Sequence, residues 1–335
     1  MTIREQTELF ELQTLSPLAA KACRSRGRQH AEAHCELRTV YQRDRDRILH
    51  CNAFRRLMQK TQMLLSPEGD HYRTRLTHTL EVSQIARTIA RGLRLNEDLT
   101  EAVALGHDLG HTPFGHAGER ALNEVCSTGY RHFEQSVRVV ERLEKDGEGL
   151  NLTYEVRNGI ACHTTGGNAD TLEGQAVRVA DKIAYLNHDI EDAIRAGILS
   201  EENIPWQVHV SLGNNKTQRI TTLVRSVIGA SHDQIEMDEK TADAFALLRR
   251  YMFDTVYIDP VAKGEEHKAE HIVKALFTFF MKNPERLPEN YKRILEADGQ
   301  ERAVCDYISG MSDRYATAVY NDIFIPKPWK TALYD

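Results

Sequence analysis

The chain lacks the features that mark several large classes of protein. Its 335 residues include six cysteines, but no two of them form a Cys-x-x-Cys pair of the kind used by zinc sites and redox motifs. The most apolar late stretch, Ala275–Met281, is far too short to cross a membrane. Proline- or serine-rich linkers and fixed-period repeats are also missing. These absences favour one globular unit over a membrane protein, a repeat array or a string of linked modules.

The net charge and the spacing of the cysteines further limit the class of protein. The net charge is −6, so the chain is not a default binder of nucleic acid or membranes, although a local basic patch remains compatible with it. The opening MTIREQTELF is charged where a secretory signal peptide would be apolar. Irregular cysteine spacing favours buried free thiols in a reducing compartment. We therefore expect a soluble, cytoplasmic protein without a membrane partner. The cysteines are Cys23, Cys35, Cys51, Cys126, Cys162 and Cys305.

Helical periodicity dominates what is present. Apolar residues recur every three to four positions through most of the chain, and alternating strand patterns are scarce. Asn96 followed by acidic residues predicts a capped helix start. Loops are predicted at 66–73 and 164–170, and 204–238 looks less regular. We expect an all-α, single-domain unit over 1–335, with a core at about 43–200 and a C-terminal helical part at about 201–335. The periodic stretches are 43–65, 77–95, 97–111, 133–146, 175–197, 241–257, 265–282 and 305–324.

One stretch, LGHDLGHTPFGHAGE at Leu105–Glu119, concentrates histidine and acidic side chains. His107 and Asp108 are adjacent near the end of a predicted helix, so both can reach one ion lying over that end. His78 on the preceding helix and Asp181 on a later one would complete a set of two imidazoles and two carboxylates. Helical proteins build metal sites from inward side chains in this way. The mixed nitrogen and oxygen ligands suit one divalent ion among Mn, Mg, Fe, Ni and Zn.

Several motifs together resemble a known family. The order H…HD…D is similar to that of the HD phosphohydrolases. More narrowly, the chain resembles bacterial deoxynucleoside triphosphate triphosphohydrolases of the deoxyguanosine triphosphate triphosphohydrolase type, over about residues 15–325. The matching stretches are SRGR, RDRDRILH, AFRRLMQKTQ, RTRLTHTLEVSQIAR, GHDLGHTPFGHAGE, RVADKIAYLNHDIEDAIRAG and DYISGMSDRYA.

The resemblance implies an activity and a ligand set. The activity would be hydrolysis of a deoxynucleoside triphosphate (dNTP) at the α-phosphate, which releases a deoxynucleoside and intact triphosphate. The metal would polarise a phosphoryl oxygen or activate water. Arg75, three residues before His78, and Lys182, beside Asp181, resemble triphosphate contacts. The implied metal ligands are His78, His107, Asp108 and Asp181.

Four further side chains are candidates for work at the reacting phosphate. His111 lies four residues after His107, one turn further on the same helical face, and can face the phosphates. The TPFG stretch then breaks the helix and re-aims His116. We expect His116 to handle the proton, with Glu119 as its orienter or as a partner of the water. Which of the two is acid or base stays open. His132 resembles a further active-site histidine of the family.

A second group resembles residues that read the sugar. Tyr185 and Asp189 follow Asp181 by four and eight residues, so the sequence itself places them on one helical stripe. Tyr185 would crowd the 2′ position and exclude ribose, while Asp189 and Gln62 would bind the 3′-hydroxyl. Tyr257 is a candidate for a second packing residue at the sugar.

The resemblance also implies partners beyond the substrate. Members assemble into homo-oligomers and are often activated by nucleotides, so a dNTP is expected both as substrate and as a candidate activator. Arg26 and Arg28 are candidates for an effector site at a subunit interface, and Asp313 and Arg314 for an internal ion pair. Single-stranded nucleic acid is a candidate effector because of RSRGRQH and the arginines at 43–56.

Two alternative functions remain open at this point. Another HD phosphohydrolase, such as a nucleotidase, a cyclic-dinucleotide esterase or an alarmone hydrolase, would carry the same metal ligands. The HTPFGH extension and the stripe of Tyr185 and Asp189 argue against it. A catalytically silent nucleotide or nucleic-acid sensor is the other alternative. Seven other histidines are interpreted as ordinary core or surface residues: His30, His34, His50, His209, His232, His267 and His271.

Overall fold

The computed structural model describes residues 1–62, 73–164, 167–257 and 260–327, and these residues fold as helices and connecting turns without a strand. The all-α prediction is therefore confirmed. The helices within these ranges are α1 (Ile3–Thr14), α2 (Val40–His50), α3 (Asn52–Arg56), α4 (Arg75–Gly92), α5 (Glu97–Gly106), α6 (Gly115–Val125), α7 (His132–Arg138), α8 (Tyr154–Ala161), α9 (Leu172–Arg195), α10 (Trp206–Leu212), α11 (Lys216–Ala230), α12 (Glu239–Thr255), α13 (Pro260–Lys282), α14 (Glu289–Asp298), α15 (Gln300–Ser309) and α16 (Asp313–Phe324).

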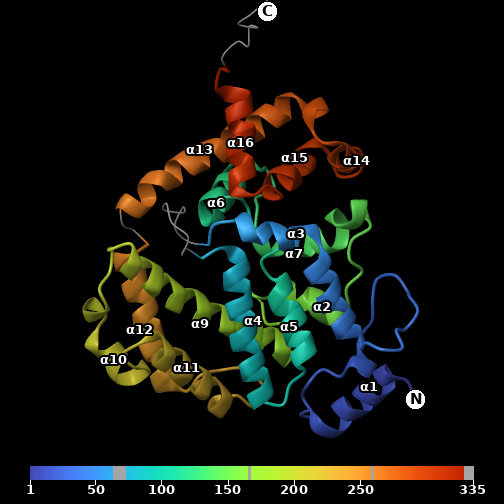
Figure 1. Cartoon of the computed structure of the whole chain (residues 1–335), viewed down its shortest axis with the longest axis vertical. Coiled ribbons are helices and arrows are strands. Elements are labelled where there is room, and N and C mark those ends of the chain that lie inside the picture. The colour runs from blue at the N-terminus through green and yellow to red at the C-terminus, as the bar shows by residue number, and fades with distance from the viewer. Residues whose placement is uncertain (63–72, 165–166, 258–259, 328–335) are drawn as a thin grey trace, which may run out of the picture.

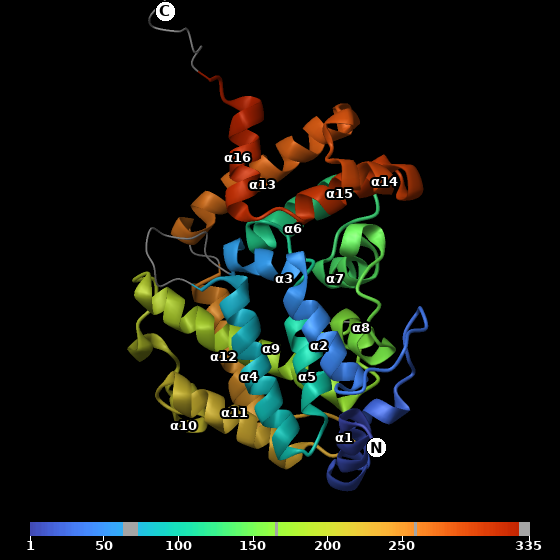
Figure 2. The ribbon, with the colours of Figure 1, turned by 45° about the vertical axis from the view of Figure 1, so that its right-hand side comes forward.

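Two hydrophobic clusters organise these helices. The larger one lies around α4, α5 and α9 and buries residues such as Ile85, Val103 and Ile183. The smaller one joins α6 to α13, α15 and α16 and buries Leu122 and Val304. Figures 1 and 2 both show α13 to α16 gathered at one end of the molecule, with α6 directly beneath them. Packing therefore does not follow chain order, because α6 comes from the first half of the sequence but belongs to the cluster of the last helices.

Local chemistry explains where several helices begin. The Asn96 side chain accepts the Leu99 backbone N–H at 3.1 Å, so the predicted cap of α5 is confirmed. The single helix predicted over 43–65 is wrong, because the chain turns extended at Cys51 and restarts as α3. The Glu144 carboxylate accepts the first free N–H groups of that new helix, 3.0 Å from the Asn52 nitrogen.

Other predictions for the connections had mixed outcomes. The region 204–238 is more regular than predicted, because it holds all of α10 and α11. The predicted loop at 164–170 is confirmed for its described residues, since 165 and 166 lie outside them. Of the connector at 66–73, only Arg73 is described. Among the described helices none combines the length and the apolar character needed to cross a bilayer.

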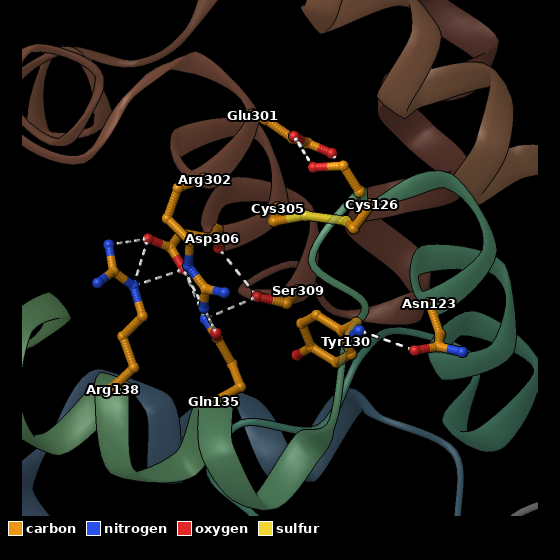
Figure 3. Close-up of a disulfide and its surroundings, with 11 residues drawn as sticks. Asn123, Cys126, Tyr130, Gln135, Arg138, Glu301, Arg302, Cys305, Asp306 and Ser309 are labelled. Atoms are coloured by element: carbon orange, nitrogen blue, oxygen red, sulfur yellow. Dashed lines mark hydrogen bonds and ion pairs between the residues drawn. A yellow bond between two sulfur atoms is a disulfide. The ribbon is translucent and has the colours of Figure 1, made fainter.

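The prediction that all six cysteines are free and buried is wrong. Cys126, at the end of α6, and Cys305, on α15, form a disulfide across 179 residues of sequence (Figure 3). Both helices pack in the same cluster, which brings the two thiols together without any sequence spacing that could have signalled it. Beside the disulfide, the Ser127 hydroxyl donates to Glu301 at 2.7 Å. The other thiols are free, and Cys23 is exposed.

The basic segments near the start of the chain are largely occupied by internal contacts. The Arg28 guanidinium is buried against Asp44 and donates to the Asn151 carbonyl at 2.6 Å. The interpretation of Arg28 as an effector-binding residue is therefore wrong, because its donors already serve the fold. Arg26 stays exposed and lies over the Tyr154 ring at 3.6 Å.

Candidate active site

Three helices bring the predicted metal ligands together. His78 projects from α4, Asp181 from α9, and His107 and Asp108 from the turn that follows the end of α5. His78 Nε2 lies 3.1 Å from Asp181 Oδ1 and 3.9 Å from Asp108 Oδ2. His107 Nε2 lies 3.5 Å from Asp108 Oδ1 and 4.0 Å from Asp181 Oδ1. We call these four residues the metal quartet.

The donor atoms of the quartet fit a divalent cation. His107 Nδ1 lies 2.6 Å from the Ala104 carbonyl, and because a carbonyl only accepts, Nδ1 carries the proton and Nε2 keeps its lone pair. That Nε2 is buried and has no hydrogen-bond partner within the described ranges. An unpaired buried acceptor is costly unless a cation or donor meets it. His78, His107 and Asp108 also lie close enough together to hold one ion.

Both quartet carboxylates are held in the charged form. Burial alone would raise the pKa of Asp108, but His107 and Arg75 hold it well below its usual range. Burial also opposes ionisation of Asp181, yet the hydrogen bond from His78 and the nearby His107 lower its pKa to about 2. Charged carboxylates are the form that binds hard and borderline cations.

Arg75 lies directly behind the quartet. Its guanidinium is almost fully buried and donates to Asp108 Oδ2 at 2.7 Å and to the Gln62 carbonyl at 3.3 Å. The residue predicted as a phosphate contact is thus first a partner of a quartet carboxylate. The Gln62 side chain is buried too, and its Oε1 has no partner among the residues described.

The HTPFGH segment turns sharply, as its sequence predicts. Phe114 adopts a left-handed backbone with φ of 61°, Gly115 follows at 57°, and α6 begins there. The break is confirmed, but the prediction for His111 is wrong in one respect. Because α5 ends at Gly106, His111 lies beyond the helix and not on a continued face of it. Its ring stacks on His132 with centroids 4.2 Å apart.

Glu119 is the partner of His132 and not of His116. One carboxylate oxygen lies 2.9 Å from His132 Nδ1 and accepts the His132 backbone N–H at 2.8 Å. Glu119 satisfies the free N–H at the start of α7 and the ring of the same residue, so its hydrogen bonds do not go to His116 as predicted. A carboxylate oxygen of Glu119 still lies within 4.8 Å of a ring nitrogen of His116. His116 instead has an exposed side chain that lines the cavity.

Glu119 and His132 each stabilise the charged form of the other. Burial opposes ionisation of Glu119, but the hydrogen bonds and charge of His132 lower the pKa of Glu119 to about 2. Burial lowers the pKa of His132, but the hydrogen bond and the charge of Glu119, together with the charge of Asp108, outweigh burial, so the pKa of His132 is raised. Each member of the pair therefore favours the charged form of the other.

A single cavity of about 700 Å³ joins these groups to the predicted sugar residues. Its volume falls within the range of small-molecule sites. The quartet members His78, Asp108 and Asp181 line one end, which we call the metal end. Gln62, Tyr185, Asp189 and Tyr257 line the same cavity, and we call this second group of residues the nucleoside end.

The nucleoside end is dominated by one pair of side chains. Tyr185 and Asp189 both project from α9 into the cavity, and the Tyr257 hydroxyl donates to Asp189. Burial raises the pKa of Asp189 to about 7 despite this hydrogen bond. The Asp189 carboxyl is therefore poised between its neutral and charged forms at physiological pH.

Cations also line the cavity wall. Lys182 and Arg249 both line it, and no hydrogen bond of the Lys182 ammonium is found in the described part of the chain. Partial burial, together with the nearby Arg178 and Arg249, lowers the pKa of Lys182. Asp181 acts on Lys182 in the opposite direction, but the lowered pKa shows that burial and the two arginines outweigh it. A lysine next to other cations is arranged to receive an anion.

Sequence reasoning missed several residues at this site. His163, in the turn after α8, lines the cavity, and its ring centroid lies 4.9 Å from that of His107. His188 on α9 pairs with Glu81 and lies edge-on to His78 at 5.6 Å. His188 had a signal, because it follows Asp181 by seven residues on the same helix face. His267, interpreted as ordinary, reaches the cavity wall from α13.

The turn that carries His111 and Phe114 is fixed from the far end of the chain. Asp313, at the start of α16, accepts the Phe114 backbone N–H at 2.8 Å and the Thr61 backbone N–H at 2.9 Å. The predicted ion pair of Asp313 with Arg314 is therefore wrong, because the carboxylate serves these N–H groups. Lys60 is buried and donates both to the His111 carbonyl and to the Ser309 carbonyl.

Comparison with known proteins agrees with this geometry. The HD domain matches residues 75–186, and the phosphohydrolase-associated domain matches residues 235–322. A deoxyguanosinetriphosphate triphosphohydrolase-like protein of Caldanaerobacter subterraneus is 56% identical over 98% of both chains. One of the same name from Desulfatibacillum aliphaticivorans is 49% identical over 98% of this chain and 99% of its own.

A solved phosphohydrolase of Bacteroides thetaiotaomicron shares the fold, with a TM-score of 0.53 at 18% identity over 83% of this chain and 68% of that one. The HD domain and the hydrolase names of the relatives place this chain among enzymes that hydrolyse phosphate esters, with a cluster of histidine and aspartate able to hold a metal ion. The chain belongs to the HD-domain family of deoxyguanosinetriphosphate triphosphohydrolase-like proteins.

Proposed function

We propose that the protein hydrolyses deoxynucleoside triphosphates of the dGTP type to the deoxynucleoside and inorganic triphosphate, with one divalent metal ion. The observation that carries this proposal is the single cavity, which is lined by His78, Asp108 and Asp181 of the metal quartet, by Tyr185 and Asp189, and by the cations Lys182 and Arg249. The names of the relatives point the same way. A triphosphate joined to a sugar would need the same three chemical environments in one cavity.

The quartet residues would hold the ion, which when bound supplies Lewis-acid polarisation of a phosphoryl oxygen and activation of water. The protein's own residues do the rest. The Lys182 ammonium would contact the phosphates. Arg75 would contact them with those N–H groups that are not bonded to Asp108. His111 faces the same space, stacked on the charged pair of His132 and Glu119.

His116 is proposed to handle the proton at the reacting phosphate. Its side chain is exposed on the cavity wall, and its ring centroid lies 5.5 Å from that of His111. Because Glu119 is engaged by His132, His116 is free to accept a proton from the attacking water or to donate one to the leaving 5′ oxygen. Glu119 then acts through His132, as the group that positions that ring.

The nucleoside end is proposed to select deoxyribose. The Tyr185 ring on α9 would occupy the space that a 2′-hydroxyl needs. Asp189 and the unpartnered Gln62 Oε1 would bind the 3′-hydroxyl, and Tyr257 would hold Asp189 in place. A buried acceptor that is paired only when substrate binds discriminates strongly against analogues that lack the donor.

The test is a product assay. Protein loaded with Mn²⁺ or Mg²⁺ is incubated with each of the four dNTPs, singly and mixed, and with GTP, and the products are separated by anion exchange. Deoxynucleoside and inorganic triphosphate are the expected products. Release of orthophosphate or pyrophosphate would move the attack away from the α-phosphate and overturn the proposal. Turnover of monophosphates alone would favour a nucleotidase, and binding without turnover would favour a sensor.

The wider expectations belong to the same proposal. We propose a cytoplasmic homo-oligomer in which a dNTP also serves as activator, and in which single-stranded nucleic acid is a candidate effector through exposed arginines such as Arg26. Sedimentation of the protein with and without dNTP tests assembly. A lag or a sigmoidal rate curve that a second dNTP abolishes tests activation.

A further inference from the structure

His163 is a buried histidine that the proposed mechanism does not use. It lies in the turn that follows α8, with 1% of its surface exposed. Its Nδ1 is 2.7 Å from the Ile160 carbonyl, three residues earlier. A carbonyl oxygen only accepts, so His163 Nδ1 carries a hydrogen, and the other nitrogen of a neutral ring has a lone pair. The backbone thus fixes which nitrogen of His163 can accept.

That accepting nitrogen faces His132. The two Nε2 atoms are 3.3 Å apart, and the ring centroids are 5.3 Å apart. Two lone pairs facing each other at this distance would repel, so one nitrogen must donate. Since His163 Nε2 is the acceptor, His132 Nε2 is the donor. The distance between the two Nε2 atoms is slightly longer than usual for a hydrogen bond from a nitrogen donor. A better acceptor could therefore replace His163 in this contact.

The opposite edge of the same ring donates as well. His132 Nδ1 is 2.9 and 3.0 Å from the two oxygens of Glu119, and an ionised carboxylate only accepts. Both nitrogens of His132 therefore carry hydrogens, and the ring is an imidazolium cation. Asp108 also favours the cation and Arg75 opposes it, and the other titratable groups that act on this ring are His111, His116 and His163. The neighbouring ring of His111 covers one face of His132.

Resting on the function proposed above, we propose that His163 is a positioning residue that holds His132 as a doubly donating cation at the cavity wall, with its Nε2–H ready for a phosphoryl oxygen. Glu119 alone would fix one edge of the ring and leave the other nitrogen free to lose its proton. His163 supplies the acceptor for that edge while the cavity holds no substrate. Both rings line the cavity, so an oxygen of the triphosphate can take over the N–H without a rearrangement of the fold.

The test uses two matched variants. His163→Gln keeps an accepting oxygen near the position of Nε2, and His163→Phe keeps a planar ring of similar size without an acceptor. The primary readout is nitrogen NMR of protein labelled with ¹⁵N-histidine and loaded with Mg²⁺, in which the His132 signals are assigned by difference from His132→Gln. This readout reports the protons on His132 directly and does not depend on turnover.

The proposal expects both nitrogens of His132 to be protonated in the wild type and in His163→Gln at pH 7, and one of them to lose its proton in His163→Phe. On the dNTP assay, kcat should fall about tenfold in His163→Phe, with metal content unchanged, and recover in His163→Gln. A neutral His132 in the wild type would overturn the proposal, and the wild-type spectrum is informative even if a variant fails to fold. A protonated His132 that persists in His163→Phe would overturn it as well.

The two proposals fail separately. If the protein turns over no dNTP but His132 is doubly protonated and responds to His163→Phe, the function is wrong and the positioning contact stands. If dNTP hydrolysis is found and His132 is neutral, the positioning proposal alone is overturned.

Discussion

The two ends of the cavity are built in different ways. At the metal end, the ligands come from two helices and one turn, His107 and Asp108 are tied to the Ala104 carbonyl and to Arg75, and His78 and Asp181 contact each other. At the nucleoside end, Tyr185 and Asp189 project from one helix, and a single tyrosine hydroxyl steadies the acid. We infer that the metal end behaves as one interlocked unit, whereas the nucleoside end can be altered residue by residue. The predictions below test this difference.

The largest expected effect is at the metal end. Asp108→Ala should remove both metal and turnover, by about 10³-fold or more in kcat, because it deletes a ligand and leaves Arg75 without its partner. Metal content by mass spectrometry and the product assay check this together. Asp189→Asn is the matched control, since it removes a buried carboxylate from the other end and should keep the metal. A metal-replete, active Asp108→Ala protein would show that the quartet is not interlocked.

The next effect lies between the two ends. His116→Ala should keep metal and substrate binding but lower turnover by about 10²-fold, the usual scale for a group that transfers a proton. Single-turnover assays on metal-replete protein check it, with His267→Ala as a control, because His267 also lines the cavity but is not proposed to react. Normal turnover in His116→Ala would remove His116 from the mechanism.

A smaller effect is expected at the nucleoside end. Tyr185→Ala should lower the preference for dGTP over GTP by about tenfold or more, because the ring that would crowd a 2′-hydroxyl is gone. The ratio of kcat/KM for the two substrates is the measurement, and Tyr185→Phe, which keeps the ring, should retain the preference. If both variants discriminate as well as wild type, ribose is excluded elsewhere.

The smallest effect concerns stability and pH. The folded-state pKa of Asp189, about 7, lies above its value of about 3.8 in an unfolded chain. The folded state therefore holds this proton more tightly, and the contribution of Asp189 to stability falls as pH rises from about 4 to about 7 and is flat above that. Metal-free Asp189→Asn should lack this fall, and at pH 8 it should be the more stable protein by on the order of 1 to 4 kcal/mol. Urea unfolding of both proteins at pH 5 and pH 8 checks it. If the free energy of unfolding changed equally between pH 5 and pH 8 in both proteins, the pKa of Asp189 would not be raised by folding.

The all-α fold and the proximity of the four metal-end residues could both be predicted from the sequence. Periodicity predicts an all-α protein, because a helix that packs on one core repeats its apolar residues every 3.6 positions. The proximity of His107 and Asp108 to His78 and Asp181 was suggested by motifs that sit on strongly periodic helices. Tyr185 and Asp189 were placed by helix geometry alone.

Contacts between segments that are distant in the chain could not be predicted from the sequence. Glu119 was expected beside His116, three residues away, but its carboxylate goes to His132 because the start of α7 lies against α6. The pairing of Cys126 with Cys305 and the break at Cys51 depend in the same way on which helices meet. A local sequence pattern predicts a single helix, whereas these features depend on which two helices pack against each other.

The contacts of Asp313 have a consequence for synthesis. The Phe114 N–H that Asp313 binds lies 199 positions earlier in the chain, and the Ser309 carbonyl that Lys60 binds is 249 positions after Lys60. A growing polypeptide therefore exposes all four ion ligands well before the segment that fixes the histidine turn has been translated. We expect chains truncated before residue 306 to bind metal but to be inactive, and turnover by such fragments would contradict this. Hydrolysis of nucleotides would then begin only after the segment that carries Ser309 and Asp313 has been translated.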